Sequence, residues 1–414
     1  MLDHTTRPAQ AKEVFTSTEG QGNLPRYFTQ VFDVATNMSR GRLDFVMPDG
    51  RVFRAEGRST GPVAEIHVHS DDVFARLIRE GDLGFCEDYL DQGWSTPDLM
   101  AFMDLLHADN DDLYDGFPGM AFVRAYERMR HWLNTNSKRQ AKKNISYHYD
   151  LGNDFYGLWL DETMTYSSAL FEEGQQSLEA AQIAKYASMV DEMGVKPGDH
   201  VLEIGCGWGG FAEYAAGQRG LKVTGLTISE EQFKFAAARL QKAGLSDRVQ
   251  LKLQDYRDER AQYDGIASIE MFEAVGEKYW PTYFGTLRDC LKPGGNATLQ
   301  IITLQDRRFE VYRSSVDFIQ KYIFPGGMLP SPTVLRQQIA KSGLEFVKSK
   351  EFGESYSVTL RRWHEVFNAK WDQIEALGFD DRFRRMWNFY LASCAATFHS
   401  GNCDVTQITM TKPS

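Results

Sequence analysis

Four glycines stand within six positions of the stretch VLEIGCGWGGFAEYAA, residues 201–216. Glycine tolerates a positive φ and allows the backbone to approach a ligand closely. The acidic Glu203 lies at the end of the preceding apolar run, and Trp208 lies inside the turn. A turn that holds a pyrophosphate normally reads GxGxxG, and the next strand then ends in a carboxylate for the ribose. Here the next strand ends in GLTISEEQ (225–232), without a carboxylate directly at its tip, so a sulfonium nucleoside fits better than a dinucleotide.

The elements around this turn alternate between helices and strands. Alternation of this kind predicts an α/β fold, in which helices cover both faces of a parallel sheet. Ligands are then expected at the carboxyl ends of the strands, where the glycine turn lies. The spacing of apolar residues predicts helices over 178–193, 209–219, 230–243 and 279–290, and strands over 200–206, 222–228, 249–256, 263–271 and 296–303.

The N-terminal part has a different pattern. Two apolar runs flank a Pro-Asp-Gly turn within residues 43–57, which predicts a β-hairpin, and residues 64–70 alternate as a further strand. Helical spacing follows over 72–93 and 96–110. The sequence therefore predicts a small α+β domain, a basic linker and an α/β domain. Their expected bounds are 1–130, 131–146 and 147–414.

The composition is that of a globular protein, with 414 residues of which 42% are hydrophobic. At roughly 100–200 residues per domain, this length suggests two domains. No apolar run approaches the length of about 18 residues that spans a membrane, and the first residues lack the pattern of a signal peptide, so we expect a cytoplasmic protein. The five cysteines form no CxxC pair, which predicts reduced thiols without a disulfide framework or a metal site. They are Cys86, Cys206, Cys290, Cys394 and Cys403.

The net charge of −11 argues against nucleic acid as a main partner. Segment 124–143 is nevertheless rich in lysine and arginine. Two interpretations stay open: a solvated helix face followed by a linker, or contact with anionic lipid headgroups, where each cation near the surface adds about 1 kcal/mol. The basic residues are Arg124, Arg128, Arg130, Lys138, Arg139, Lys142 and Lys143.

The glycine turn resembles the first motif of the Rossmann-like class I methyltransferases, which bind S-adenosylmethionine. Two further stretches are similar to that fold. One is LQDYRD (253–258) after the third strand, and the other is LKPGG (291–295), a turn common after the fifth helix. The resemblance implies that Asp255 and Tyr256 lie beside the adenine.

Five segments resemble the cyclopropane fatty acid synthase family, over about residues 140–414. The smaller N-terminal domain resembles, more weakly, the lipid-binding accessory domain of the members that act on phospholipids. Relatives that modify mycolic acids lack that domain, so the resemblance implies acyl chains of ordinary phospholipids at the inner membrane surface as substrate. The sequence does not fix the oligomeric state, and a homodimer is compatible with it. The segments are YHYDLGNDFYGLWLDETMTYSSALFE (147–172), GLTISEEQ (225–232), IEMFEAVGEKYWPTYF (269–284), FIQKYIFPGGMLPS (318–331) and FGESYSVTLRRW (352–363).

The resemblance also implies where the cofactor is held. Glu203 is given a supporting role, for which hydrogen bonding from the strand end to the loop is the alternative. The implied contacts are Tyr166 and Ser167 ahead of the sheet, Gly205, Cys206, Gly207 and Gly209 in the turn, Thr227 and Gln232 after the second strand, and Asp255 with Tyr256.

The chemistry of this family makes specific demands. An alkene is a poor nucleophile, so its attack on a sulfonium methyl requires alignment, a dry site and stabilisation of a carbocation. Aromatic faces attract cations by about 0.5–2 kcal/mol. The family motifs contain several rings that could line an acyl tunnel, although an ordinary core role is the alternative for each. These rings are Tyr149, Phe155, Tyr166, Phe272, Tyr322, Phe324 and Tyr356.

The cation must afterwards lose a proton, and in ring-forming members the resemblance implies a bound bicarbonate ion as the base. Glu273 and Tyr356 match the family's bicarbonate pocket, and Ile302 can offer its backbone. Ser168 and Gln300 stand where the family has cysteine and histidine; both can still donate hydrogen bonds to an anion. These departures weaken the expectation of bicarbonate and leave Glu273 itself as the alternative acceptor.

Cys394 matches a cysteine that is often marked as catalytic in the family. Alkene methylation does not require a thiolate, and a small apolar cysteine on a helix is usually a packing residue. A direct role and a packing role both stay open.

The first functional hypothesis is an enzyme that adds the methyl carbon of S-adenosylmethionine across a cis double bond of a phospholipid acyl chain and closes a cyclopropane. The second keeps substrate and cofactor but stops at a methyl-branched or methylene-bearing chain. A lipid-binding or regulatory protein with a vestigial site is a third, against which the complete glycine, Glu273 and Tyr356 motifs argue. A methyltransferase for small molecules is the last.

Overall fold

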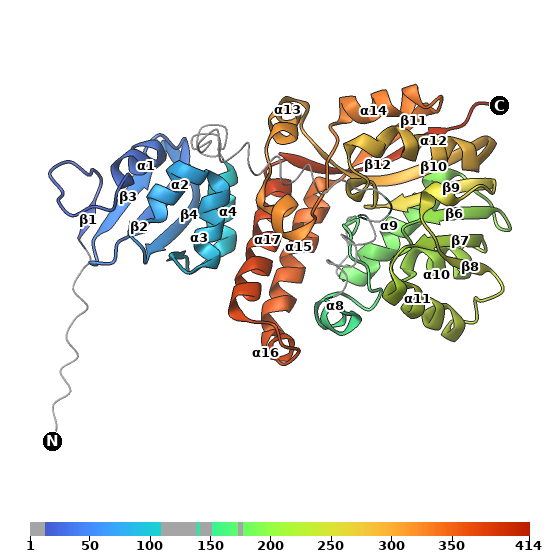
Figure 1. The fold of residues 1–414 in the computed structure, drawn as a ribbon, viewed down its shortest axis with the longest axis horizontal. Coiled ribbons are helices and arrows are strands. Elements are labelled where there is room, and N and C mark those ends of the chain that lie inside the picture. Colours follow the sequence, from blue (N-terminus) through green and yellow to red (C-terminus); the bar gives the residue numbers. More distant parts are fainter. Residues whose placement is uncertain (1–12, 109–137, 139, 141–150, 173–176) are drawn as a thin grey trace, which may run out of the picture. The chain divides into compact units, whose positions relative to one another are not determined.

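The structure, a computed structural model, describes residues 13–108, 138, 140, 151–172 and 177–414 (Figure 1). The chain divides into two compact units, Met1–Arg124 and Ala125–Ser414. The expected basic linker, apart from Lys138 and Gln140, lies outside the described residues.

The N-terminal unit contains a five-stranded sheet with the order β1-β3-β2-β4-β5. The predicted hairpin is confirmed, since β2 and β3 are antiparallel and Gly50 in the turn has a φ of 89°. Phe28 on α1 packs against Phe53 and Phe74, and all three rings are buried. The helical stretch expected over 72–93 is two helices, because Gly81 interrupts it with a φ of 71°. The elements are β1 Val14–Phe15, α1 Phe28–Ala35, β2 Arg40–Val46, β3 Val52–Glu56, β4 Ser59–Val68, α2 Val73–Glu80, α3 Asp82–Leu90, β5 Trp94–Ser95 and α4 Leu99–Ala108.

The C-terminal unit is built on a seven-stranded sheet with the order β11-β12-β10-β9-β6-β7-β8. The predicted strands pair in parallel, whereas β12 is antiparallel to both β10 and β11. The chain adds β7 and β8 on one side of β6 and then places β9 and β10 on the other. Such a reversal leaves a crevice for a ligand beyond the carboxyl ends of β6 and β9. The strands are β6 His200–Ile204, β7 Lys222–Thr227, β8 Val249–Leu253, β9 Tyr263–Ile269, β10 Leu291–Leu304, β11 Glu345–Glu351 and β12 Cys403–Thr411.

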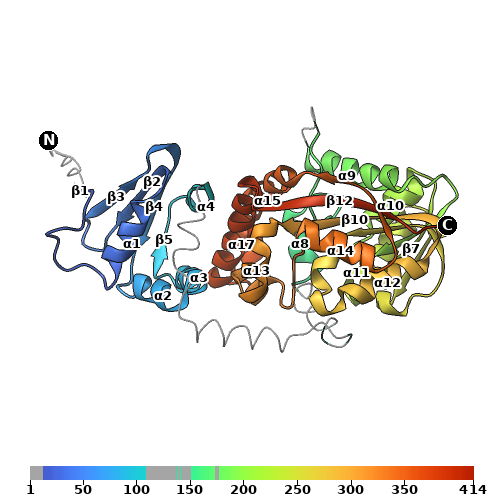
Figure 2. The ribbon, with the colours of Figure 1, turned by 90° about the horizontal axis from the view of Figure 1, so that it is seen from above.

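Helices cover both faces of this sheet, and Figure 2 shows α9 and α12 on opposite sides of it. On one face, Met189 of α9 and Phe211 of α10 share a core with Val223 of β7. On the other, Phe284 of α12 shares a core with Ile266 of β9. Helices α15 and α17 pack against each other and against β12. The helices are α8 Asn153–Trp159, α9 Leu178–Met193, α10 Gly210–Gly217, α11 Glu230–Lys242, α12 Trp280–Cys290, α13 Asp306–Ser314, α14 Pro332–Lys341, α15 Gly353–Ala369, α16 Trp371–Glu375 and α17 Asp381–His399, with short turns η1 Tyr256–Asp258, η2 Phe272–Ala274, η3 Glu277–Tyr279 and η4 Ile319–Ile323.

Several strand boundaries differ from the sequence prediction, among them the end of β6, which lies at Ile204 and not at residue 206. Strand β8 ends at Leu253, because the side chain of Asp255 accepts a hydrogen bond from the backbone of Arg257 and starts the turn η1. Strand β9 ends at Ile269, because Glu270 adopts a φ of 48°, which lies outside the extended region. Residues 291–295, expected as a turn, belong instead to β10, and the pairing of β10 with β9 is irregular between residues 291 and 296.

Within the described ranges, no helix combines the length and the apolar character that would let it cross a membrane. In the same ranges no group of His, Cys, Asp and Glu side chains forms a metal-binding cluster.

Candidate active site

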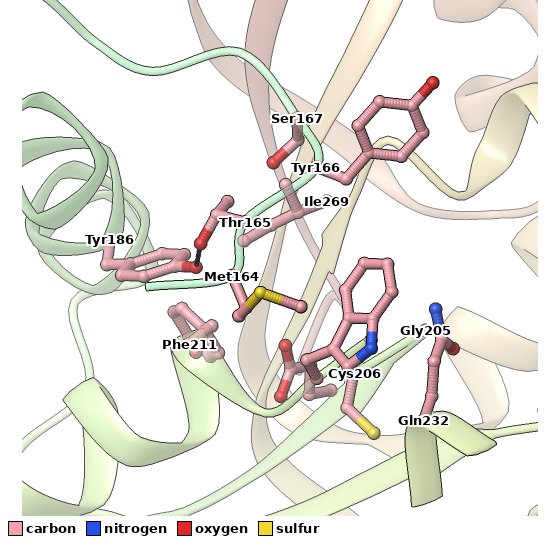
Figure 3. Close-up of a pocket in the computed structure, with 14 residues that line it drawn as sticks. Met164, Thr165, Tyr166, Ser167, Tyr186, Gly205, Cys206, Phe211, Gln232 and Ile269 are labelled. Atoms are coloured by element: carbon pink, nitrogen blue, oxygen red, sulfur yellow. Dashed lines mark hydrogen bonds between the residues drawn. The ribbon is translucent and has the colours of Figure 1, made fainter. Parts of the chain in front are cut away.

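A pocket lies at the point where the strand order reverses (Figure 3). Its walls come from the glycine turn, from the segment that precedes α9, and from the first turns of α10 and α11. Figure 3 shows Thr165 and Tyr186 turned toward each other, with a hydrogen bond between their hydroxyl groups. The pocket brings together these predicted cofactor residues: Tyr166, Ser167, Glu203, Gly205, Cys206, Gly207 and Gln232.

The glycine turn leaves room for a ligand. Gly205 and Gly207 have φ values of 84° and 51°, which favour glycine. A Cβ on Gly205 would lie 2.8 Å from the side chain of Met271, whereas a Cβ on Gly207 would meet no described atom within 4 Å. Since Gly207 lines the pocket, the open space beside it is available to a ligand.

Glu203 is a buried carboxylate in the wall of this pocket. Burial raises its pKa to about 8, and the ammonium group of Lys185 acts in the opposite direction. Among the described residues its Oε2 has no hydrogen-bond partner, so this oxygen does not bind the loop. With this pKa the carboxyl group of Glu203 holds a proton at neutral pH, and a cation bound beside it would stabilise the ionised form. S-adenosylmethionine carries two such cations, a sulfonium and an ammonium group.

The remaining predicted cofactor residues do not line the pocket. Gly209 precedes α10, and Thr227 donates a hydrogen bond of 3.0 Å from Oγ1 to Oε1 of Gln232. At the end of β8, Asp255 accepts hydrogen bonds of 2.8 and 2.6 Å from the guanidinium group of Arg257. Although burial acts in the opposite direction, these bonds lower the pKa of Asp255, which therefore stays ionised. Tyr256 follows it, buried, at the start of η1.

A second polar cluster lies beyond the end of β9 and beside residues 300–302 of β10, around Glu270. Its Oε1 accepts hydrogen bonds of 2.8 Å from the backbone N–H of Ser168 and 2.8 Å from Nε2 of Gln300. The hydroxyl group of Tyr356 is also hydrogen-bonded to this carboxylate. Burial raises the pKa of Glu270, while the charge of Lys185 and these hydrogen bonds oppose the rise.

The same donors were expected to hold bicarbonate, and they are already engaged. The backbone N–H of Ile302 donates to Oε1 of Glu273 at 2.6 Å. The hydroxyl group of Ser168 donates to the backbone oxygen of Ala169 at 2.8 Å. The residues that the sequence singled out are therefore brought together around carboxylates of this chain, and the arrangement does not fit a bound bicarbonate ion.

Glu273 differs from Glu270 in its surroundings. Burial and the charge of Glu270 raise the pKa of Glu273 to about 8. Its Oε2 has no hydrogen-bond partner within the described part of the chain. At neutral pH Glu273 therefore keeps its proton, and Glu270, which has several donors and a facing cation, is the better proton acceptor.

The predicted aromatic rings separate into groups. Tyr166 lies 5.4 Å from Trp363 and 6.5 Å from Phe324 between ring centroids, and its hydroxyl group is 2.8 Å from that of Tyr390. Tyr356 lies 6.1 Å from the ring of Trp363, so these residues form one aromatic group beside the polar cluster.

Other predicted rings have core roles. Phe272 packs against Trp280 of α12, and Phe155 packs against Trp387. Tyr322 packs against Phe318. Tyr149 lies outside the described residues.

Cys394 lies on α17, where its side chain is half-buried. Burial raises the pKa of its thiol well above the ordinary value. The thiol form that results favours a packing role.

The sequence analysis missed two charged residues of this site, Glu270 and Lys185. Glu270 follows a predicted strand directly and stands three positions before Glu273, so two acids flank one turn. Lys185 occupies the buried stripe of α9, between Ala181 and Met189 at a spacing of four residues. A lysine on the buried face of a helix is the signal that could have revealed it.

Comparison with known proteins identifies the relatives of this chain. A sequence profile for mycolic acid cyclopropane synthetase matches residues 136–408. The chain belongs to the cyclopropane synthase family. Together with the pocket at the end of β6, this membership makes the protein an S-adenosylmethionine-dependent methyltransferase.

Two relatives within the family resemble most of the chain. Tuberculostearic acid methyltransferase UfaA1 of Mycobacterium tuberculosis is 38% identical over 384 residues, which cover 87% of each protein. Cyclopropane-fatty-acyl-phospholipid synthase of Escherichia coli K12 is 38% identical over 353 residues, which cover 84% of this chain and 88% of the relative.

A solved structure supports the fold. Mycolic acid cyclopropane synthase CmaA1, in complex with SAH and CTAB, is similar with a TM-score of 0.61 and 30% identity. The similarity covers 66% of this chain and 98% of that one. The predicted Rossmann-like class I methyltransferase fold is thereby confirmed.

Proposed function

We propose that this methyltransferase modifies the cis double bond of an unsaturated fatty acyl chain in membrane phospholipid. The cofactor pocket adjoins the aromatic group around Tyr166, which suits an apolar chain and a developing cation. The names of relatives in the family, which include a fatty-acyl-phospholipid synthase, support this substrate class. We also propose that the N-terminal unit is the lipid-binding accessory domain and that the enzyme works at the inner membrane surface.

The reaction has two steps that the site must serve. When bound, S-adenosylmethionine supplies its methyl carbon as an electrophile, and the electrons of the broken C–S bond stay on sulfur. The π electrons of the alkene form the new C–C bond, which leaves a cation on the neighbouring carbon. That cation must lose a proton, and the electrons of the broken C–H bond then close either a ring or a new double bond.

We assign the proton to Glu270, and one observation carries this assignment. Its Oε1 accepts the two 2.8 Å hydrogen bonds from Ser168 and Gln300, the residues that the family resemblance had suggested for an external base. A carboxylate of the chain thus stands at the position expected for bicarbonate.

We propose a methyl-branched or methylene-bearing acyl chain as the product. The carboxylate of Glu270 is attached to the chain, so it can reach only a limited set of C–H bonds of the substrate. The bicarbonate implied for ring-forming members does not fit, because Ser168 and Gln300 already donate their hydrogen bonds to Glu270. The similarity to a tuberculostearic acid methyltransferase supports this choice. A cyclopropane is the second candidate, because the identity to the Escherichia coli synthase is equally high.

The test is to express the protein in a host whose phospholipids contain cis-unsaturated chains and to analyse the extracted lipids. Mass spectrometry should show chains that have gained one CH2 unit, which either product explains. Proton NMR should then show olefinic signals of a branched or methylene product. Ring protons at high field would instead support the cyclopropane, and unmodified lipids would contradict the substrate class. The Gly207→Val enzyme, expected to lack cofactor binding, is the control.

A further inference from the structure

Lys185 is a buried lysine on α9 that connects the two halves of the site. Its Nζ donates a hydrogen bond of 2.6 Å to Oγ of Ser167 and lies 4.9 Å from the ring centroid of Tyr186. Ser167 and Tyr186 both line the cofactor pocket. Helix α9 therefore holds the ammonium group of Lys185 against two residues that line the cofactor pocket.

The charges that act on this lysine are carboxylates. Burial lowers the pKa of Lys185, and Glu270, Asp161 and Glu203 oppose that shift, with Glu270 the strongest of the three. In return, Lys185 is the strongest influence against the rise in pKa that burial imposes on Glu270. Geometry places the two groups on one segment, because Lys185 donates to Oγ of Ser167 and the next residue, Ser168, donates its backbone N–H to Glu270 at 2.8 Å. Since an unpaired charge in the interior is costly, each of the two groups stabilises the charged form of the other.

We propose that Lys185 is a positioning residue for methyl transfer, whose ammonium group keeps Glu270 ionised and fixes the Ser167 hydroxyl at the cofactor wall. The proposal rests on the proposed function, because it takes Glu270 as the proton acceptor. It gives the site a cation that prepares the acceptor before the substrate cation forms, and burial lowers the pKa of this cation to about 7.

Other titratable groups also face Glu270. Glu273 of η2 and Tyr356 of α15 hold their protons near neutral pH, because burial raises the pKa of both. In these forms both groups are neutral, and neither carries a positive charge at any pH, so neither can replace the charge of Lys185 in keeping Glu270 ionised. Asp161 and Glu203 of β6 also act on Lys185, and burial raises the pKa of Glu203 to about 8, so Glu203 acts as a carboxylate only at higher pH.

The test is the pH dependence of kcat for the full-length Lys185→Met enzyme, with saturating S-adenosylmethionine and vesicles of cis-unsaturated phosphatidylglycerol. An opposite charge nearby changes a carboxyl pKa by about 1–3 pH units. Loss of the Lys185 charge should therefore raise the pKa of Glu270, and the acidic limb of the kcat profile, where turnover falls as the pH falls, should move to higher pH by that amount. At a pH well below the wild-type midpoint, turnover should fall by about tenfold for each pH unit that the limb moves, and it should recover at high pH. A purely structural role would lower kcat by the same factor at every pH.

The matched control is Lys234→Met, since Lys234 is an exposed lysine of α11 paired with Glu231. Its acidic limb should coincide with that of the wild type. A Lys185→Met limb at the wild-type pH would overturn the proposal. If that variant does not fold by circular dichroism, Lys185→Gln, whose amide can still bind Ser167, replaces it. Failure of both to fold would assign Lys185 to folding and also overturn the proposal.

The Glu270→Gln enzyme separates the two hypotheses. Normal turnover of this variant would contradict the proposed function, because the proton would then leave by another route. If Glu270→Gln is impaired and the Lys185→Met limb is unmoved, only the role of Lys185 is wrong.

Discussion

Replacing Glu270 with glutamine removes the proposed proton acceptor and its charge while it keeps the shape of the side chain. The amide oxygen can still accept the hydrogen bonds that Ser168 and Gln300 donate at 2.8 Å. Glu270 is also absent from the residues that line the cofactor pocket. We therefore expect a folded enzyme whose affinity for S-adenosylmethionine changes little.

The expected loss in this variant lies in the chemical step. A positioned general base contributes about 10²–10⁴-fold to a rate. That range corresponds to about 2.7–5.4 kcal/mol in the activation barrier. We expect kcat to fall by this factor, measured as modified acyl chain per enzyme by mass spectrometry at saturating cofactor, while isothermal calorimetry reports an unchanged Kd.

Glu273→Gln is the matched control for this experiment. Burial and the neighbouring carboxylate raise the pKa of Glu273 to about 8, so it is protonated at pH 7. An amide then replaces a neutral acid, and we expect less than about a tenfold loss, below the contribution of a base. A loss of 10²-fold or more in Glu273→Gln, with near-normal Glu270→Gln, would refute the assignment.

The Glu270→Gly enzyme tests whether an added anion can replace the lost carboxylate. The φ of 48° at this position suits glycine, so the backbone should tolerate the change. Loss of the side chain frees the N–H of Ser168 and the amide of Gln300 for an added anion. Bicarbonate or formate should then restore part of the turnover in Glu270→Gly and none in Glu270→Gln. No rescue by either anion would mean that these donors do not define the acceptor position.

Two further predictions concern the cofactor and the membrane. Gly207→Val should abolish S-adenosylmethionine binding in calorimetry while circular dichroism stays native, because the side chain enters pocket space and penalises the φ of 51°; an unchanged Kd would show that the turn does not hold the cofactor. Charge reversal at Lys138, Arg139, Lys142 and Lys143 should weaken sedimentation with anionic vesicles, and added salt should weaken it in the wild type. Equal, salt-insensitive sedimentation of both proteins would assign the segment to a linker.

The cofactor half of the site could be predicted from the sequence because its requirements are local. A positive φ at Gly205 and Gly207 is encoded by the residue type itself, and the apolar periodicity of neighbouring segments indicates the strand before the turn and the helix after it. Such local patterns predict the α/β order and the parallel sheet formed by β8, β7, β6, β9 and β10. Together with the family motifs, they also predict that Tyr166, Ser167 and Gln232 gather at one pocket. Strands β11 and β12 were not predicted.

The choice of Glu270 as the proposed proton acceptor depends on the tertiary structure. The sequence offers Glu270 and Glu273 three positions apart, and residue type cannot rank two glutamates. Their difference comes from remote groups: the N–H of Ser168 lies 102 positions from Glu270 in the chain, and Lys185 reaches the site from α9. Burial, donor direction and facing charge set a carboxyl pKa, and all three exist only after distant segments have packed together.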